Sequence, residues 1–456
     1  MNVRNYMKTA LAVAVLGVLT GCSLTPQYQR PNAELPESWV APQVAASDTP
    51  DEWNDLFKDA ELQQLMTEAL AANHDLAAAA TRIEQARASA KIASSRLLPY
   101  ASASVGGSRQ KELNGTRSLS STDDSQLSIS YELDFWGGNR ANVQAAAARV
   151  AARQYDMETT RLVLQADVAS YYFQTLALKD RLAISQKNLE AARSLMSLVE
   201  VRYNKGAASG LDVAQQRTAL LSIEAEVPEL QQSLIETQSA LALLLGRVPQ
   251  DFTIRTETLA DVQPPAIAAG QPGDLLQRRP DVRAAEADLV AANADIGVAR
   301  AALYPSMELS ATGVVTNWLT GGSASVAALA TSLSQVLFDG GELRGQVQLA
   351  DASRRELVET YLQTVLTSVK EVNDSLSAVS TAERRTSLLT QTVEQAQLAL
   401  RLATTRYHAG SDDLLTVLES QTSQLNAEDS LVQAKLARVN ASITLFKALG
   451  GGWEAS

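Results

Sequence analysis

The chain has 456 residues, of which 46% are hydrophobic and 20% are charged, and its formal net charge is −12. This composition excludes a disordered chain, and the length allows one large core or two to three domains. The acidic balance argues against a nucleic-acid partner, because phosphate binding requires a basic face. Beyond the N-terminus, no apolar run of about 18 residues or more predicts a transmembrane helix.

The first 21 residues have the pattern of an export signal, with two basic residues ahead of an apolar stretch from Leu11 to Leu19. That stretch is too short to span a bilayer. It closes on Leu19-Thr20-Gly21-Cys22, which resembles the lipobox of bacterial lipoproteins; the resemblance implies removal of residues 1–21 and acylation of Cys22. The residue after the cysteine is Ser23. An Asp at this position would resemble the signal that retains lipoproteins in the inner membrane, so its absence favours the outer membrane. The alternative is an ordinary signal peptide with a chance cysteine.

The rest of the chain contains an internal repeat. Arg202-Tyr203-Asn204-Lys205-Gly206 recurs 204 residues later as Arg406-Tyr407-His408-Ala409-Gly410. The same ungapped offset pairs further residues, among them Leu211 with Leu415, Leu245 with Leu449, and Gly246 with Gly450. Upstream of the predicted strands the offset becomes 206 and pairs Asp75 with Asp281 and Pro99 with Pro305. The chain therefore consists of one structural unit used twice.

Each repeat is predicted to contain the same elements in the same order. An alanine-rich helix, over about 75–96 and 281–302, ends before a proline that cannot continue it. Two short strands follow in each repeat, at about 100–110 and 126–136 and then at about 306–316 and 331–338. A very long helix next runs to the Arg-Tyr pair, and a shorter helix returns to Gly246 or Gly450 after a glycine-containing turn.

The predicted long helix of the first repeat covers residues 140–204, which is about 65 residues or ~97 Å. No compact core has that length, so the helices must bury their apolar seams side by side, as in a coiled coil or a helical cylinder. The runs Ala77–Ala80 and Ala145–Ala148 permit close approach of helices, and alanine also has high helix propensity. The fold class is mainly α with a small β part.

The predicted strands have two unlike faces. In the second strand, apolar side chains alternate with polar ones. The apolar residues are Leu127, Ile129, Tyr131, Leu133 and Phe135, and the polar residues are Ser128, Ser130, Glu132 and Asp134. Glu308 is a polar residue of the third strand. One interpretation is an α+β domain in which the apolar face packs on a helix. The other places the apolar face against lipid and the polar face in a wet lumen. Four strands cannot close a barrel, so a membrane role requires several copies.

The mature chain resembles the TolC-like outer-membrane efflux channel family, in its NodT/OprM-type lipoprotein branch. The resemblance rests on Leu24-Thr25-Pro26-Gln27-Tyr28, on the Arg-Arg-Pro-Asp-Val-Arg-Ala-Ala-Glu run over 278–286, on Phe338-Asp339-Gly340-Gly341, and on the paired Arg-Tyr-x-x-Gly turns. It implies a homotrimer with a twelve-stranded outer-membrane β-barrel, a twelve-helix periplasmic α-barrel and an equatorial domain. The repeats cover 75–246 and 281–450, the equatorial domain takes parts of 22–74 and 247–280, and 451–456 is a tail.

The resemblance also implies roles for particular residues. The helix turns form periplasmic tips that contact an adaptor protein; this set comprises Arg202, Tyr203, Gly206, Leu211, Arg406, Tyr407 and Gly410. Leu415 and Glu419 match a leucine and an acid that constrict the pore in close relatives, one of which has Asp in the second position. The first-repeat equivalents are Leu211 and Gln215, so the charge belongs to one tip only. Judged without the family, Leu415 is a helix-seam leucine and Glu419 an exposed acid that suits the helix dipole.

The sequence contains no pattern for catalysis, for a metal site or for a cofactor other than the covalent lipid. The two histidines, His74 and His408, lie far apart in sequence, and the only cysteine is Cys22. No nucleotide-binding loop is found. The predicted function is a passive outer-membrane efflux conduit, with a periplasmic membrane-fusion adaptor and an inner-membrane pump of the RND type as partners. The alternatives are the outlet of a type I secretion system and a non-conducting, lipid-anchored trimeric coiled-coil scaffold.

Overall fold

The computed structural model describes residues 23–40, 53–111, 119–250, 252–260, 262–264, 266–319 and 321–451. The predicted signal peptide over 1–21, the lipidation residue Cys22 and most of the 451–456 tail lie outside the described residues. Among the described residues, no helix combines the length and the hydropathy that a membrane span requires.

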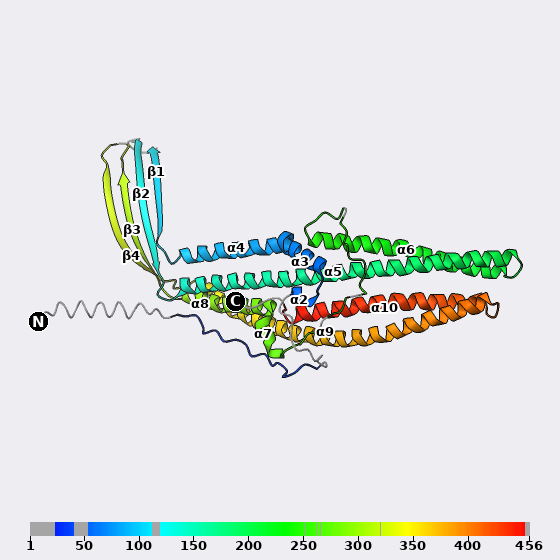
Figure 1. The fold of residues 1–456 in the computed structure, drawn as a ribbon. Helices are drawn as coiled ribbons and strands as arrows, with labels where there is room; N and C mark the ends of the chain where they lie inside the picture. The colour runs from blue at the N-terminus through cyan, green and yellow to red at the C-terminus, as the bar shows by residue number, and fades with distance from the viewer. Residues whose placement is uncertain are drawn as a thin grey trace. The chain divides into compact units, whose positions relative to one another are not determined.

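The two halves of the chain contain the same elements in the same order (Figure 1). The first half has α4 (His74–Ser95), β1 (Tyr100–Lys111), β2 (Leu119–Leu133), α5 (Gly138–Asn204) and α6 (Gly210–Leu244). The second has α8 (Pro280–Ala301), β3 (Ser306–Thr316), β4 (Ala324–Ser334), α9 (Glu342–His408) and α10 (Leu414–Ala448). Equivalent helices have equal lengths of 22, 67 and 35 residues. These lengths confirm the predicted duplicated unit.

Short elements precede each repeat, and the chain divides into two compact units. The elements are α2 (Trp53–Leu56) and α3 (Ala60–Ala72) before the first repeat, and η1 (Pro272–Asp274) and α7 (Leu275–Arg278) before the second. Unit 1 comprises the described parts of Met1–Asn32, Thr81–Tyr155 and Arg283–Gln363 and contains the sheet. Unit 2 comprises those of Ala33–Ala80, Asp156–Val282 and Thr364–Ser456.

The largest apolar core lies in unit 2, where the segments predicted as equatorial pack on the long helices. Trp53 of α2 meets Phe446 of α10 edge-on, with ring centroids 4.9 Å apart, and Phe57 lies 4.7 Å from Phe173 of α5. The Tyr172 hydroxyl donates a hydrogen bond to the Asp59 carboxylate at 2.8 Å. Buried aromatic side chains dominate core energetics because each removes a large area from water. This cluster therefore fixes α2 and α3 against the helices.

The N-terminal segment that follows residue 22 lies on α8 in unit 1. Thr25 packs so closely on Gly297 that a Cβ atom there would clash with it. Arg30 donates to both carboxylate oxygens of Glu286, at 2.6 and 2.7 Å, and the Tyr28 hydroxyl lies 3.4 Å from the same group. Burial and the charge of Glu286 together raise the pKa of Tyr28 to about 12. The two sequence marks at 24–28 and 278–286 thus form a single contact.

The second strand differs from its predicted bounds, 126–136, at both ends. It begins at Leu119 because the polar residues before Gln126 pair one by one with β1. It ends at Leu133 because Asp134 accepts hydrogen bonds from the backbone N–H groups of Asn139 and Arg140, both at 2.9 Å, and so caps the start of α5. Asp134 and Phe135 therefore lie outside the strand, which corrects their predicted place in it.

The fourth strand covers Ala324–Ser334, whereas the sequence predicts 331–338. Its partner β3 begins at Ser306, and Ser306 pairs with Ser334. The residue before Ser306 is a proline, which has no N–H to continue the ladder. The apolar residues 336–338 led to the prediction, but they lie beyond the last paired residue. Asp339 then starts α9 by accepting hydrogen bonds from the N–H groups of Gly341 and Leu343.

The Arg-Arg-Pro-Asp run at 278–281 forms a buried joint in unit 2. Arg279 is 8% exposed, and its guanidinium donates to both carboxylate oxygens of Asp281, at 2.9 and 2.6 Å. The same group reaches Glu371 of α9 at 2.6 Å and the carbonyl of Ala448 in α10 at 3.2 Å. Burial lowers the pKa of Arg279, but the hydrogen bonds and charges of its two acids outweigh burial and raise it. One side chain thus ties three helices together.

Replacing Arg279 with methionine is expected to lower the free energy of unfolding by about 1.5–3 kcal/mol, because two partly exposed carboxylates and a carbonyl lose their donor. Chemical denaturation of the purified protein measures this loss. The exposed neighbour Arg278 provides the matched control, since Arg278→Met removes the same charge and is expected to change stability by less than about 0.5 kcal/mol. Equal losses in the two variants would contradict the assignment of the joint to Arg279.

Candidate functional site

The four strands form one antiparallel sheet in the order β1-β2-β3-β4 (Figure 1). Four apolar residues of β2 lie opposite small or apolar residues of β3: Leu127, Ile129, Tyr131 and Leu133 against Gly313, Ala311, Leu309 and Met307. The intervening residues are polar in both strands: Ser128, Ser130 and Glu132 against Thr312, Ser310 and Glu308. Because successive side chains point to opposite faces, the register gives these two strands one apolar and one polar face.

The apolar face continues onto the outer strands. Ala101 of β1 pairs with Ile129, and Leu329 of β4 pairs with Ala311. Leu329 is 84% exposed, and the face also exposes Leu127 and Leu333. β1 and β4 each have one neighbour in the sheet, so each edge presents unpaired backbone groups. Within the described chain, the apolar face and both edges are therefore left uncovered.

The polar face brings two carboxylates directly opposite each other. Glu132 of β2 pairs with Glu308 of β3, and both side chains are exposed. Like charges at opposed positions repel, and a medium of low dielectric constant strengthens that repulsion. The pair therefore requires water on this face. The sequence places both residues on the polar face, but their pairing depends on the register, which no sequence pattern specifies.

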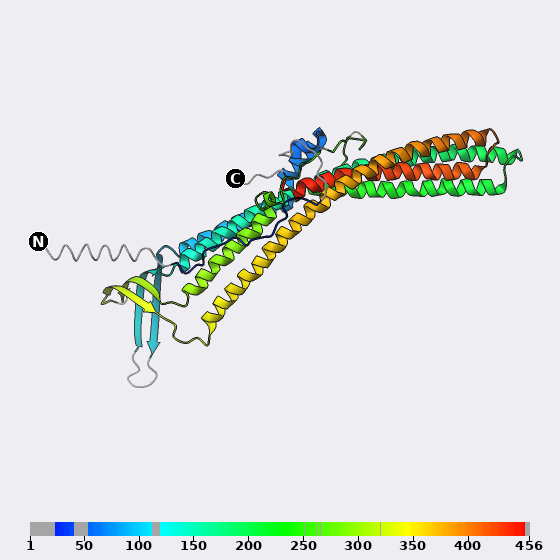
Figure 2. The same cartoon turned by 90° about the horizontal axis from the view of Figure 1, so that it is seen from below.

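The turns after α5 and α9 lie in unit 2, at the ends of the two long helices (Figure 2). They share one backbone conformation. Gly206 and Gly410 have φ angles of +74° and +75°, a conformation that favours glycine. In each turn, the N–H after the glycine bonds the carbonyl of the arginine five residues earlier, Arg202 at 2.8 Å and Arg406 at 3.0 Å. This pattern is a Schellman motif. The repeated Arg-Tyr-x-x-Gly sequence thus ends each long helix.

The two returning helices begin with equivalent caps built from different residues. Ser209 accepts a hydrogen bond from the N–H of Asp212, at 3.2 Å, at the start of α6. In α10, Asp413 accepts from the N–H and the hydroxyl of Thr416, at 3.0 and 2.7 Å. These bonds stabilise the carboxylate and lower the pKa of Asp413. The cap fixes the first turn of α10, which contains Leu415, and Glu419 follows in the second turn.

Leu415 and Glu419 lie one helical turn apart and therefore on the same face of α10. Leu415 is 47% exposed, and Glu419 is exposed as well. The seam positions belong instead to Leu414 and Val417, which are 3% and 2% exposed and pack against α5 and α9. The interpretation of Leu415 as a seam leucine is therefore wrong. Both predicted gate residues project away from the helix seam.

Some of the residues predicted to form the tips have exposed side chains, and others have buried ones. Tyr203 and Leu211 are 50% and 65% exposed, but the equivalent tyrosine, Tyr407, is 5% exposed. Arg202 covers Tyr407, with the guanidinium carbon 4.2 Å from the ring centroid, and donates to the Tyr407 carbonyl at 3.0 Å. Arg406 instead pairs with Asp412 in its own turn, at 3.2 Å. Arg202 and Tyr407 thus tie the end of α5 to the end of α9.

Replacing Arg202 with alanine is expected to loosen this tie by about 1–2 kcal/mol, because a cation–π contact and charged hydrogen bonds are lost. Amide hydrogen exchange in the two turns should then accelerate by roughly tenfold. Exchange measured by mass spectrometry on peptides from both turns checks the result. Arg406→Ala is the matched control, since its salt bridge stays within one turn. Equal acceleration in both variants would show that the contact between Arg202 and Tyr407 does not hold the two turns together.

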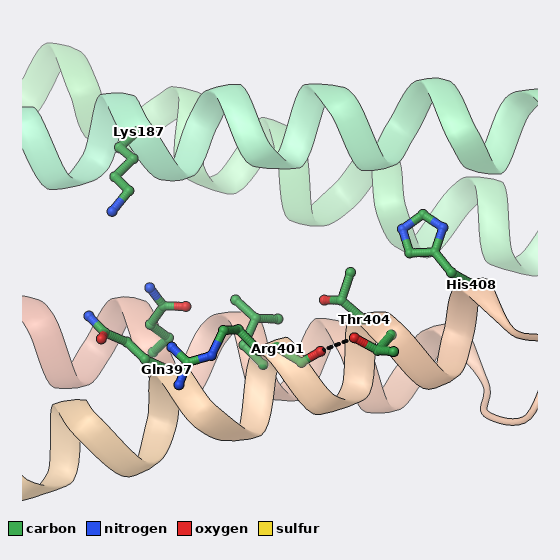
Figure 3. A pocket seen from close by; sticks show the side chains of 8 residues that line it. Lys187, Gln397, Arg401, Thr404 and His408 are labelled. Carbon is green, nitrogen blue, oxygen red and sulfur yellow. Dashed lines mark hydrogen bonds between the residues drawn. The ribbon is translucent and has the colours of Figure 1, made fainter.

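Two open hollows lie beside these helices in unit 2. One, of about 650 Å³, lies between α9 and α10 and includes Glu419 among its lining residues. The other, of about 560 Å³, reaches from α5 to α9 and includes His408 (Figure 3). Among the residues that the structure describes, no group of three or more histidine, cysteine, aspartate or glutamate side chains could hold a metal ion.

Comparison with known proteins relates this geometry to a family. The sequence model of the outer membrane efflux proteins matches residues 65–247 and 272–451. These two stretches correspond to the two structural repeats. The chain belongs to the outer membrane efflux protein family. The predicted family is therefore confirmed, and this protein is an outer-membrane component of an efflux system with a transport role.

Individual outer membrane efflux proteins match this chain over nearly their whole length. The pyoverdine export outer membrane protein OpmQ of Pseudomonas putida is 39% identical over 96% of this chain and 96% of its own. OpmQ of Pseudomonas aeruginosa is 38% identical, with 98% of each chain covered. The open-state structure of the MtrE outer membrane channel of Neisseria gonorrhoeae superposes with a TM-score of 0.86 at 28% identity, covering 95% of this chain and 99% of that one. The fold is thus that of an outer-membrane channel.

Proposed function

We propose that three copies of this chain close one twelve-stranded barrel, in which β1 of each copy pairs with β4 of the next. The observation that carries this proposal is the two-faced sheet with two uncovered edges. Lipid does not tolerate an open sheet edge, and four strands are too few to enclose a lumen. The apolar face meets lipid through Leu127, Ile129, Tyr131 and Leu133. The polar face lines the lumen through Ser128, Ser130, Glu132 and Glu308.

Below the barrel, the long helices of the three copies form a periplasmic cylinder that meets an adaptor protein and an inner-membrane pump of the RND type. The exposed tip residues Tyr203, Leu211 and Arg406 support an adaptor contact at this end. The pump supplies the energy, since the sequence has no nucleotide-binding loop. This chain is then the passive conduit of the system.

The exported compounds are proposed to be small solutes or drugs. Two matching relatives are named for pyoverdine export and toluene efflux, which are unlike cargoes. A wide, wet lumen with a polar face carries such different molecules without a tight binding site. The choice of cargo then falls to the pump.

A lipid on Cys22 anchors the chain in the inner leaflet of the outer membrane. This proposal rests on the lipobox sequence at 19–22. The described chain adds the contacts of Thr25, Tyr28 and Arg30 with α8, which hold the segment directly after Cys22. A lipid supplies one membrane attachment, and barrel closure supplies the second.

Leu415 and Glu419 form the gate at the periplasmic end. Their exposure away from the helix seam supports this role, because a constriction requires side chains that project into the pore. Three copies of Glu419 around one axis repel one another when ionised and attract cations. The closed pore is therefore expected to be narrow and cation-selective.

Planar-bilayer recording of the purified protein tests the conduit. We expect discrete conductance steps and a reversal potential that favours cations over anions. A trimer that conducts no ions would favour the scaffold alternative and contradict the proposal. In cells, deletion of the gene should increase sensitivity to some antibiotics, detergents, bile salts or metals, and the wild-type gene should restore resistance.

A further inference from the structure

The apolar face of the sheet carries a basic pair at the end far from the helices. Ala101 of β1 pairs with Ile129 on this face, and every second residue of β1 from Ala101 onward therefore points the same way. Arg109 and Lys111 belong to that series, and both are exposed. β1 begins at Tyr100, close to the end of α4 (Figure 1), so the pair lies at the opposite end of the strand.

The apolar band of β2 ends before it reaches the level of this pair. Beyond Leu127, the same face of β2 continues with three polar residues: Ser125, Asp123 and Ser121. Leu119, opposite Lys111, is separated from the band by these polar side chains. The basic pair therefore lies outside the continuous apolar surface.

Aromatic residues lie near both limits of the apolar band. At the far end, Trp318 is 47% exposed in the turn after β3, and the N–H of its neighbour Asn317 donates to the Asp123 carbonyl at 2.7 Å. At the helical end, Trp136 stacks on Tyr304 with ring centroids 4.7 Å apart. Aromatic girdles flank the apolar band of membrane barrels at both interfaces. Asp123 therefore lies at the level of the outer interface of the proposed barrel.

Strand geometry gives the height of the basic pair in that barrel. Arg109 pairs with Ser121, which lies twelve residues from Leu133 at the end of β2, or ~40 Å along the strand. Barrel strands tilt by about 35–45°, so this length corresponds to about 30 Å across the membrane, whereas the apolar band of such barrels is about 25 Å tall. Arg109 lies just beyond the hydrocarbon, and Lys111 lies about 5 Å further out. Both are at the level of lipid headgroups.

The described residues leave this basic pair without a neutralising acid. Arg109 and Lys111 form no ion pair among them. Asp123 is the one acid that the four strands place on the apolar face, and its carboxylate accepts a hydrogen bond from the N–H of Leu319 at 2.9 Å. The strand that the proposed trimer sets beside β1 is β4, which has no charged residue. The two positive charges therefore face outward uncompensated.

We propose that Arg109 and Lys111 bind the phosphate groups of lipopolysaccharide, the phosphorylated glycolipid of the outer leaflet. The inference rests on the proposed barrel and names the lipid that contacts its outer rim. Guanidinium and ammonium groups donate charge-assisted hydrogen bonds to phosphate oxygens, and their long stems extend along apolar surface to the headgroups. At the offset of 206, the second repeat has the uncharged Val315 and Asn317. A trimer therefore carries three such pairs.

The competing explanation is that the two cations only keep β1 from pairing with foreign strands. Lysine on exposed sheet edges commonly has that role. In the proposed barrel, β1 has a neighbour on both sides, so the role ends with assembly while the side chains still face the lipid. Cations that served only this purpose would have no preference for a phosphorylated lipid.

Native mass spectrometry of the purified full-length protein, titrated with lipid in detergent micelles, tests the proposal. The probe is bisphosphorylated lipid A, and its twin lacks both phosphates. We expect wild type to bind up to three lipid A molecules per trimer, and R109Q/K111Q to bind lipid A at least about tenfold more weakly. The dephosphorylated twin should bind both proteins equally weakly.

The matched control is R87Q/K91Q, which removes one arginine and one lysine from exposed positions of α4 that form no ion pair among the described residues. This variant should bind lipid A as wild type does. Equal binding of lipid A to wild type and R109Q/K111Q would overturn the proposal. Displacement of lipid A by equimolar phosphatidylglycerol or by millimolar inorganic phosphate would also overturn it, because either result shows no preference for the glycolipid.

Bilayer conductance of the same preparations separates the lipid contact from the conduit. Because Arg109 and Lys111 face away from the lumen, R109Q/K111Q should conduct as wild type does and with the same ion selectivity. A selectivity shift in this variant would place the pair in the lumen and overturn the lipid contact. Absence of conductance in wild type contradicts the conduit, whereas the ratio of the lipid A affinities still decides the contact.

Discussion

Replacing Ile129 with arginine is expected to prevent assembly in the outer membrane, whereas Ser128→Arg is expected to permit it. The two residues are neighbours in β2 but belong to opposite faces of the sheet, opposite Ala311 and Thr312 of β3. An arginine on the lipid face near the bilayer centre costs about 2–4 kcal/mol, and a trimer carries that cost three times. An arginine on the wet face keeps its hydration and costs little.

The assay for this pair is the yield of assembled protein in outer-membrane fractions, read as a heat-modifiable band on a denaturing gel. Ser128→Arg should assemble normally and shift the reversal potential toward anions, because three positive charges enter the lumen. The opposite assignment of the faces predicts the reverse, with Ile129→Arg assembled and Ser128→Arg lost. Normal yields of both variants would indicate that neither face meets lipid.

The double substitution L415A/E419A is expected to raise the bilayer conductance several-fold. Both side chains project away from the seam of α10, so in the proposed gate their removal should widen the pore without disturbing the packing of Leu414 and Val417. Loss of the carboxylate also removes the charge that attracts cations. Single-channel recording measures the conductance, and the single variant E419Q should lower cation selectivity with a smaller change in aperture.

The duplication provides the control for this prediction. L211A/Q215A makes the equivalent change in the first repeat, where Leu211 is also exposed but the residue one helical turn later is the neutral Gln215. We expect it to raise conductance less than L415A/E419A does. Unchanged conductance of a correctly assembled L415A/E419A trimer would remove Leu415 and Glu419 from the gate.

The sequence predicted the architecture because the duplication is visible in it. Helix ends are encoded locally, by a proline after α4 and α8 and by a glycine after α5 and α9, so their predicted bounds lie within two residues of those in the structure. The apolar alternation of β2 predicted its two faces, and the register with β3 shows them. Sequence patterns therefore predict an element correctly when neighbouring residues determine its structure.

The errors in the prediction occur where a distant partner decides the outcome. The start of β2 and the position of β4 depend on pairing with β1 and β3, and the sequence of β4, Ala324–Ser334, has no clear alternation. The sequence places Arg279 in a motif, but its partners Glu371 and Ala448 are 92 and 169 residues away. Tyr203 and Tyr407 are equivalent in sequence, yet one is exposed and the other buried, because only Tyr407 lies under Arg202.

The copy number of the assembled protein decides whether its sheets close into one trimeric barrel. The described part of each chain forms a four-stranded sheet with two uncovered edges, and a twelve-stranded barrel requires three chains. Native mass spectrometry of the protein released from lipid nanodiscs gives the mass of the intact assembly. We predict a single species with the mass of three chains and their lipids. A stable monomer or dimer in the bilayer would contradict the trimeric barrel, because its sheet edges would remain open in lipid.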